Sequence, residues 1–331
     1  MHIGARAHAS VLQRPAPLEL LLEAISDCDR LVLLGDAIEL IQARPEKALE
    51  IAEPIFRTIG ARLGPDREVV LVPGNHDGPL VHAWALAQGQ ALALDSRVPI
   101  DASPLLARVT GWLAPARVEV RYPGAWLTDT VWATHGHYLD VHLIPVSSYG
   151  VIRGRRRLPV GGELPSDYER LLRPRLGRTL RWLPSPVDAA LADLGELIRA
   201  STMPIARYRI LHPRLAPLTS RLLGVQMRRF SLRAISRVVH GLGVGADVVI
   251  FGHVHRLGPL PGDDPAPWRD PAGGLSLLNT GSWRYESVLL HRSQPPHPYW
   301  PGGAIVLEDG AAPRAIGLLD GLAVEQLHPP R

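Results

Sequence analysis

The sequence predicts an α/β protein built around a largely parallel sheet. Four short aliphatic runs, at 30–37, 67–78, 130–138 and 246–255, each break off into glycine and polar residues. Between the first two runs, residues 45–64 carry apolar side chains at helical spacing. Continuous apolar runs bounded by turn signals are typical of strands buried on both faces. Their alternation with helices favours a parallel sheet.

Length and composition are those of a globular chain. The 331 residues suffice for a large core, and 46% of them are hydrophobic while 21% are charged. The single cysteine, Cys28, excludes an intramolecular disulfide and a cysteine-based zinc site. We expect one domain over residues 1–331, with an insertion described below.

No apolar run reaches the roughly 18 residues that a membrane-spanning helix needs, and the first residues lack a signal-peptide pattern. We therefore expect a cytoplasmic protein, with peripheral association at a membrane surface left open. The net charge is +4, and Lys47 is the only lysine. Since arginine supplies nearly all the positive charge and Ala, Gly and Pro abound, a coding bias is favoured over a nucleic-acid-binding patch.

The remaining elements are predicted from the same signals. Before the first strand, residues 17–28 have a helical pattern. After the fourth strand, residues 275–283 and 302–310 are predicted strands, and the Asp-Gly within 307–316 indicates a hairpin.

Residues 145–240 depart from the alternation of strands and helices. A basic loop is followed by helix-like segments separated by prolines, which together form a mostly helical insertion between the third and fourth strands. We expect its last helix, within 228–243, to pack on the sheet and lead into the fourth strand. The earlier helices would form a cap over the site.

Side chains with metal-binding chemistry follow all four predicted strands. They are Asp36, then Asn75, His76 and Asp77, then His135 and His137, and finally His253 and His255. Ligands of such sheets bind beyond the carboxyl ends of the strands, so these residues are expected to meet. Carboxylate, amide and imidazole ligands suit a divalent metal of intermediate hardness, such as Mn²⁺, Fe or Zn²⁺. Several imidazoles and few carboxylates favour two such ions over calcium.

Spacing supports this hypothesis. His253 and His255 are two residues apart, so both imidazoles can face one point if the backbone stays extended. Gly35, Gly74 and Gly252 precede the motifs and permit sharp turns and close approach to the ions.

The segments GDAIE, GNHD, HGH and GHVH, in this order, resemble four of the five signature blocks of the calcineurin-like metallophosphoesterase family. The matching blocks span residues 35–255. The resemblance implies a four-layer αββα sandwich around two sheets, with a two-metal site at the strand ends.

The resemblance also implies a role for each ligand. His2 and His255 would hold the first ion, and Asn75, His135 and His253 the second. Asp36 would bridge both ions.

The histidine of GNHD has a catalytic role by the same resemblance. His76 would donate a proton or stabilise the transition state, and Asp77 would orient it. His137 receives no role, and an outer-shell position is as compatible with the pattern as a ligand position.

The family's first block reads Asp-x-His, and His2-Ile3-Gly4 matches its end. We expect the natural protein to begin upstream and to supply the aspartate, although a chance match at the terminus stays an alternative. Without that aspartate we expect weak or single-metal occupancy and poor activity.

The resemblance implies a hydrolase in which a hydroxide activated by two metal ions attacks a phosphodiester, a phosphomonoester or a pyrophosphate. The substrate would be a small-molecule or lipid-linked phosphoester, with nucleic acid as an open alternative. Arg153, Arg155 and Arg156 could contact a second phosphate or an anionic surface, although a solvated loop is favoured over that contact. Two further alternatives are a relative of the UDP-diacylglucosamine pyrophosphatases and a catalytically impaired scaffold that binds a partner. The oligomeric state is not predicted.

Overall fold

The computed structural model describes residues 1–5, 10–143, 158–159, 162–172, 230–270, 274–286, 290 and 293–327. The strands are β1 Arg30–Leu34, β2 Glu68–Val72, β3 Asp95–Arg97, β4 Arg117–Trp126, β5 Val131–Thr134, β6 Val248–Phe251, β7 Leu257–Gly258, β8 Ser276–Thr280, β9 Gly303–Val306 and β10 Arg314–Gly317. The α-helices are α1 Pro15–Ala24, α2 Pro45–Leu63, α3 His82–Gln88, α4 Pro104–Gly111, α5 Asp140–Leu143, α7 Pro165–Leu172 and α11 Val324–Leu327. Residues 230–241 are also helical. Short 3₁₀ turns are η2 Val11–Gln13, η3 Gly78–Leu80, η4 Gly89–Ala91, η5 His137–Leu139 and η8 Ala266–Trp268.

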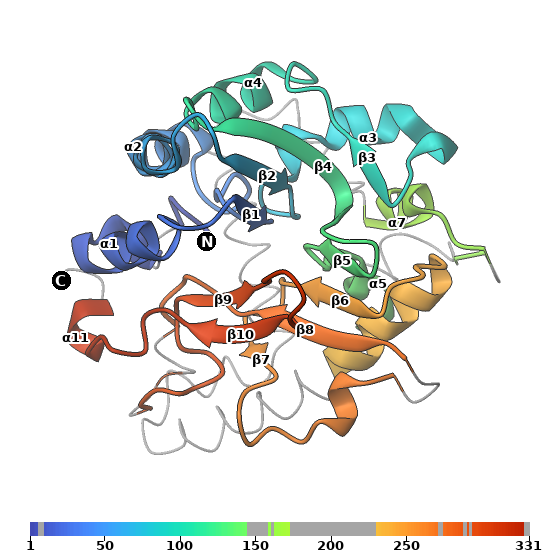
Figure 1. Cartoon of the computed structure of the whole chain (residues 1–331). Helices are drawn as coiled ribbons and strands as arrows, with labels where there is room; N and C mark the ends of the chain where they lie inside the picture. The colour runs from blue at the N-terminus through green and yellow to red at the C-terminus, as the bar shows by residue number, and fades with distance from the viewer. Residues whose placement is uncertain are drawn as a thin grey trace, which may run out of the picture.

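One curled sheet runs in the order β1-β2-β4-β5-β6-β8-β7, with β3 paired to β4 and a separate β9–β10 hairpin. The four predicted strands are confirmed as β1, β2, β5 and β6. They pair in parallel with a neighbour, β1 with β2 and β5 with β6. Figure 1 shows the β1-β2-β4 half above the half formed by β5, β6, β8 and β7.

Residues alternate between two faces along each strand, as a buried pleated sheet requires. In β2, Val69 and Leu71 join the core under the helices, whereas Val70 and Val72 face inward. In β5, Trp132 faces the second helical layer and Ala133 the interior. The inward-facing clusters of the two halves share Leu34 and Leu127, so the halves pack against each other.

Helices cover the outer face of each half. The core cluster of α1, α2 and α4 lies against β1 and β2. Helix 230–241 buries Ile235 and Val239 against Val249 and Leu277 on the other side. The predicted four-layer α/β fold is therefore confirmed, as is the docking of the last inserted helix on the sheet.

The two halves are not separate sheets, because β4 belongs to both. Residues 117–120 pair in parallel with β2, and residues 124–126 pair antiparallel with β5. This strand was not predicted, since Pro123 interrupts a run of alternating charged and apolar residues. Gly124 permits the close crossing, because a Cβ there would lie 2.6 Å from the ring of Trp132.

One predicted helix ends earlier than expected, and much of the predicted insertion lies outside the described residues. Helix α1 ends at Ala24 rather than near Cys28, because Ser26 and Asp27 favour turns over helix interiors. Within the predicted insertion, α7 and helix 230–241 are present, while the basic loop and the other predicted helices lie outside the described residues.

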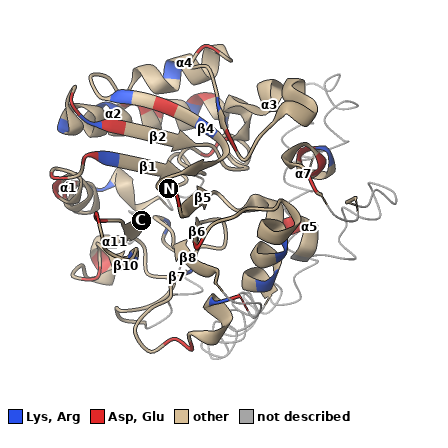
Figure 2. Ribbon diagram, turned by 45° about the vertical axis from the view of Figure 1, so that its right-hand side comes forward, with Lys and Arg blue, Asp and Glu red and all other residues tan. Residues whose placement is uncertain are grey.

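Charges of both signs lie side by side on α2 and β4 (Figure 2). Several arginines are paired with acids, for example Arg30 with Glu68 at 2.6 Å and Arg121 with Asp95 at 3.0 Å. On these two described elements the positive charge is therefore interspersed with negative charge. Among the helices that the structure describes, none has the length and apolar character to cross a bilayer.

Candidate metal centre

The sheet brings the predicted ligands together at the carboxyl ends of its parallel strands. Asp36 follows β1, Asn75 follows β2, His135 follows β5 and His253 follows β6. His2 reaches the same place from the N-terminal segment. Its backbone N–H donates to the carbonyl of Asp36 at 2.6 Å, and Ile3 forms a parallel bridge with Ile38.

Four of these residues turn the chain through the left-handed region. Their φ values are +52° at His2, +50° at Asp36, +65° at His253 and +57° at His255. Such conformations are unfavourable for residues with a Cβ and cluster at functional sites. Each turn aims a side chain across the ends of the strands.

The first group of ligands contains two imidazoles that face each other. Nε2 of His2 lies 3.0 Å from Nε2 of His255 and 3.5 Å from Oδ2 of Asp36. His76 lies next to this group, and ligand atoms of His2, Asp36 and His76 lie within 4.8 Å of one another.

The second group shares the same carboxylate. Nε2 of His135 lies 3.1 Å from Oδ2 of Asp36 and 3.1 Å from Oδ1 of Asn75. The opposite nitrogen of His135 donates to the carbonyl of Leu34 at 3.2 Å, which leaves Nε2 free to bind a cation. Ligand atoms of Asp36, His135 and His253 lie within 4.8 Å of one another.

The protonation states suit cation binding. Burial lowers the pKa of His2 to about 4, and burial together with His2 holds the pKa of His255 well below its usual range. Burial disfavours the charged form of Asp36, but His135 and His2 outweigh it and hold the pKa of this carboxyl well below its usual value. Neutral imidazoles beside an ionised carboxylate are the ligand forms that a divalent metal requires. The donors of the first group are therefore in forms that fit a divalent cation, whereas in the second group Asp140 outweighs burial and raises the pKa of His253.

Comparison with known families assigns the chain. The sequence profile of the calcineurin-like phosphoesterase family matches residues 8–257, about three quarters of the sequence. The chain belongs to the calcineurin-like phosphoesterase family. No curated protein matches it.

Within this family assignment, the matched range contains every ligand predicted from the sequence except His2. His2 nevertheless lies beside Asp36 and His255, so the structure places it with the other predicted ligands.

The prediction that Asp77 orients His76 is wrong. The Asp77 carboxylate is fully buried and accepts hydrogen bonds from the backbone N–H of Ala37 at 2.7 Å and of Gly74 at 2.5 Å. It therefore joins the loops after β1 and β2, which carry Asp36 and Asn75. Burial and the neighbouring Asp36 raise the pKa of Asp77.

Glu39, which sequence reasoning did not assign, orients His76 instead. Its buried carboxylate lies 2.7 Å from Nδ1 of His76 and 3.1 Å from Nδ1 of His2. These contacts lower the pKa of Glu39 despite its burial and, against burial, raise the pKa of His76. The signal was available in GDAIE, where a glutamate stands three residues after the aspartate.

The prediction that an extended backbone points His253 and His255 at one place is wrong. The backbone is not extended there, since both residues have positive φ. As a result the two imidazoles do not face one point. His255 contacts His2, whereas the ring of His253 lies 5.3 Å from that of His135.

Two other predicted positions stand apart from the ligand groups. His137 is buried with its ring 5.6 Å from that of His135, and its Nε2 lies 3.4 Å from the hydroxyl of Tyr122, which places it behind the ligands. Arg153, Arg155 and Arg156 lie outside the described residues.

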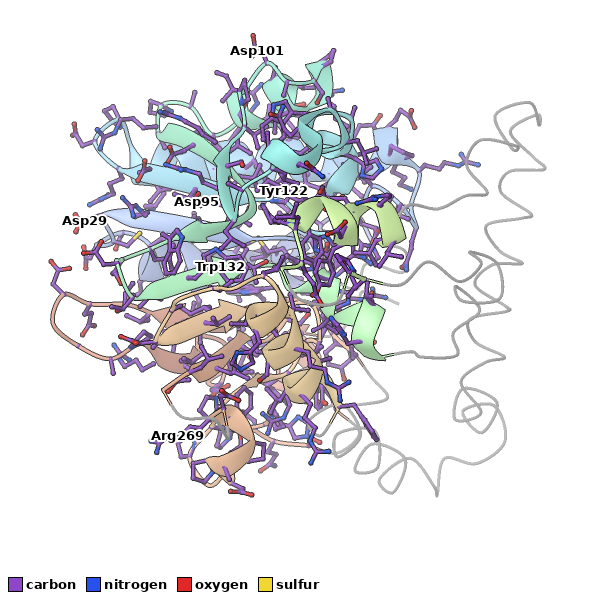
Figure 3. All side chains as sticks on the ribbon, turned by 90° about the vertical axis from the view of Figure 1, so that its right-hand side faces the viewer. Asp29, Asp95, Asp101, Tyr122, Trp132 and Arg269 are labelled. Atoms are coloured by element: carbon purple, nitrogen blue, oxygen red, sulfur yellow. The ribbon has the colours of Figure 1, made fainter. Side chains whose placement is uncertain are left out.

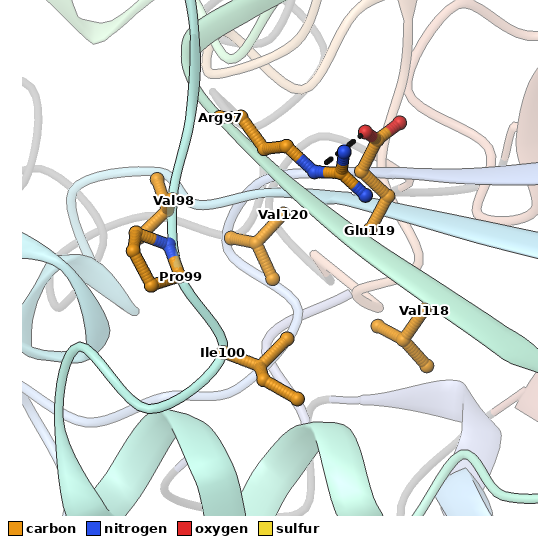
Figure 4. A pocket seen from close by; sticks show the side chains of 7 residues that line it. All are labelled: Arg97, Val98, Pro99, Ile100, Val118, Glu119 and Val120. Carbon is orange, nitrogen blue, oxygen red and sulfur yellow. Dashed lines mark ion pairs between the residues drawn. The ribbon is translucent and has the colours of Figure 1, made fainter.

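A shallow groove of about 330 Å³ lies at another place, between β4 and the segment after β3. Figure 4 shows its apolar lining, Val98, Ile100, Val118 and Val120 among it, beside the ion pair of Arg97 and Glu119. No predicted site residue lines it.

Proposed function

We propose that this protein hydrolyses a phosphoester with two divalent cations held by the two ligand groups. Family membership supports metal-dependent phosphoester hydrolysis in general. The observation that supports two ions is the position of Asp36, whose Oδ2 lies 3.5 Å from His2 and 3.1 Å from His135. One carboxylate between two sets of imidazoles is suited to bridge a pair of cations.

In this proposal His2, Asp36 and His255 hold one cation, and Asp36, Asn75, His135 and His253 hold the other. Bound cations of this kind supply Lewis-acid polarisation of a phosphoryl oxygen and a water that loses its proton near neutral pH. Mn²⁺ is the first candidate, with Fe and Zn²⁺ as alternatives, because the donors are imidazole, carboxylate and amide.

In this proposal His76 donates a proton to the leaving group. Glu39 accepts a hydrogen bond from Nδ1 and favours the protonated imidazole, whose Nε2–H is then the donor toward the departing oxygen. The His76 side chain is 15% exposed, so it remains reachable by a substrate. Asp77 supports the site by holding its two loops together.

The experiment measures hydrolysis of bis-p-nitrophenyl phosphate with Mn²⁺ for the wild type, Asn75→Ala and His253→Ala. We expect the wild type to turn over and both variants to lose activity below detection. His240→Ala is the matched control, because this histidine is 56% exposed on helix 230–241 and pairs with Asp270 rather than with the site. A ligand variant at full rate would contradict the assignment.

Metal analysis of the same proteins counts the cations. Two bound Mn²⁺ per chain support the two-ion proposal, whereas a single bound Mn²⁺ contradicts it. If the wild type hydrolyses no phosphate mono- or diester, the result favours the alternative of a catalytically impaired scaffold that binds a partner.

The substrate class stays broad in this proposal. A small-molecule or lipid-linked phosphoester, a pyrophosphate and a nucleic acid all present the phosphoryl group that the site would bind. The suggested contact of Arg153, Arg155 and Arg156 with a second phosphate remains a prediction.

A further inference from the structure

Asp140 contacts one of the proposed cation ligands from outside both ligand groups. It is the first residue of α5, five residues after His135, and its Oδ1 lies 2.9 Å from Nε2 of His253. The side chain of His253 is 16% exposed and that of Asp140 is 37% exposed.

The other histidines of the centre show what such a contact does. His135 donates from Nδ1 to the carbonyl of Leu34, and His2 faces Glu39 with Nδ1. In each case an acceptor on one ring nitrogen fixes the tautomer and directs the opposite nitrogen to the ligand group.

In His253 the two ring nitrogens have the opposite roles from those in His135 and His2. Its Nε2 faces Asp140, so Nδ1 is the atom left to bind a cation beside Asp36 and His135. The left-handed backbone at His253 gives the ring an unusual starting direction, with φ of +65°.

We infer that Asp140 is a positioning residue that fixes His253 for the second cation. Its carboxylate accepts a hydrogen bond from Nε2–H, presents Nδ1 to the ion and adds negative charge next to a group that has only the shared carboxylate of Asp36. This inference rests on the proposed function.

The test compares Asp140→Ala and Asp140→Asn with the wild type after removal of metal. Mn²⁺ binding is followed by calorimetry, and spin coupling between two Mn²⁺ is followed by electron paramagnetic resonance. Loss of an outer carboxylate partner weakens metal affinity about 10–100-fold. We expect this loss for one of the two ions in Asp140→Ala. Asp140→Asn should be intermediate, because its amide oxygen still accepts the hydrogen bond.

His142→Gln is the matched control on the same helix. His142 contacts the hydroxyl of Tyr168 at 2.9 Å, so its replacement perturbs α5 without touching His253. It should bind both ions with wild-type affinity. Excess Mn²⁺ should restore turnover in Asp140→Ala, a rescue that a merely misfolded variant would not show.

The outcomes separate the two proposals. If the wild type binds two ions and Asp140→Ala binds both equally well, the role of Asp140 is overturned and the proposed function stands. If both Asp140 variants fail to bind even in excess Mn²⁺ while the control binds, Asp140 is itself a ligand or a folding determinant and the positioning role fails. If the wild type binds no Mn²⁺, both proposals fail.

Discussion

The residues of the metal centre are placed by backbone conformations that ordinary side chains avoid. Four ligand-bearing residues have positive φ, each at a cost of about 1–3 kcal/mol. Glycine relieves the crowding between them. At Gly35, with φ of +76°, an added Cβ would lie 2.3 Å from Nδ1 of His135. The hydrogen bond from that nitrogen to Leu34 would then be lost.

We predict that Gly35→Ala displaces His135 and lowers Mn²⁺ affinity at least about 10-fold, since the ring loses its fixed acceptor. Mn²⁺ titration of the metal-free protein measures the effect. Gly64→Ala is the matched control: Gly64 also has positive φ, +72°, but an added Cβ meets nothing within 4 Å. Both variants should lose about 1–3 kcal/mol of folding stability, because alanine is strained at positive φ, and equal Mn²⁺ affinities would contradict the predicted clash.

The sequence indicated the ligand set but not the partners that orient it. Asp36, Asn75, His135 and His253 stand directly after predicted strands, so strand order alone brings them together. Glu39 and Asp140 were not predicted, because their contacts depend on how a loop and a short helix fold back over the strand ends. The assignment of Asp77 was wrong for the same reason. Adjacency in sequence to His76 says nothing about which backbone groups its carboxylate reaches.

At the scale of elements, α7 carries a buried carboxylate into the wall behind His137. Glu169 is 4% exposed and accepts hydrogen bonds from the hydroxyls of Tyr122 and Tyr138, the latter at 2.6 Å. The ring of Tyr138 also stacks on Tyr168 of α7 at 4.8 Å. Figure 3 shows Tyr122 next to α7. Glu169 thus ties a helix of the insertion to β4 and η5.

We predict that Glu169→Gln destabilises the fold by about 1–3 kcal/mol at neutral pH, because charge-assisted hydrogen bonds are lost. Burial raises the pKa of Glu169, but hydrogen bonds and His137 outweigh it and lower the pKa below the ordinary 4.5. A lowered pKa in the folded state contributes stability above pH 4.5 that is lost as the pH falls further.

The free energies of unfolding of the wild type and Glu169→Gln, measured by denaturant at several pH values, should therefore differ most above pH 4.5. The difference should shrink as the pH falls below that value. Glu19→Gln is the control, since this side chain is 75% exposed. A difference that is constant with pH would show that the carboxylate is not ionised in the folded protein.

Elements with a regular hydrophobic period were predictable, and those shaped by tertiary contacts were not. The strands β1, β2, β5 and β6 are buried on both faces, so their continuous apolar runs are distinctive. Helix α2 was predicted despite Pro54, because its apolar spacing continues past the proline. By contrast, β4 alternates between charged and apolar residues and carries Pro123. It forms a strand because β2, β3 and β5 supply its hydrogen-bonding partners.

For the whole molecule, the proposed cations would join distant parts of the chain. Their ligands come from the first residues, from both halves of the sheet and from the segment after β6. The unfolded chain does not hold these groups together, so cations that bind here should stabilise the native state by mass action.

We predict that Mn²⁺ at 100 times its Kd stabilises the protein by about 2.7 kcal/mol per site, with a corresponding rise in melting temperature. A chelator should reverse the rise, and His253→Ala should show a smaller one. Calorimetric melting at fixed protein concentration measures this, with His240→Ala as the control. A melting temperature that does not respond to Mn²⁺ would argue against a preformed site.

The continuity of β4 limits how the two halves of the sheet can move apart. A hinge that parted the two halves of the sheet would have to break the hydrogen bonds at one end of a single ten-residue strand. If the proposed reaction takes place here, we therefore expect its substrate to enter and leave past the loops at the strand ends. Mutations that alter turnover without altering metal affinity should map to those loops.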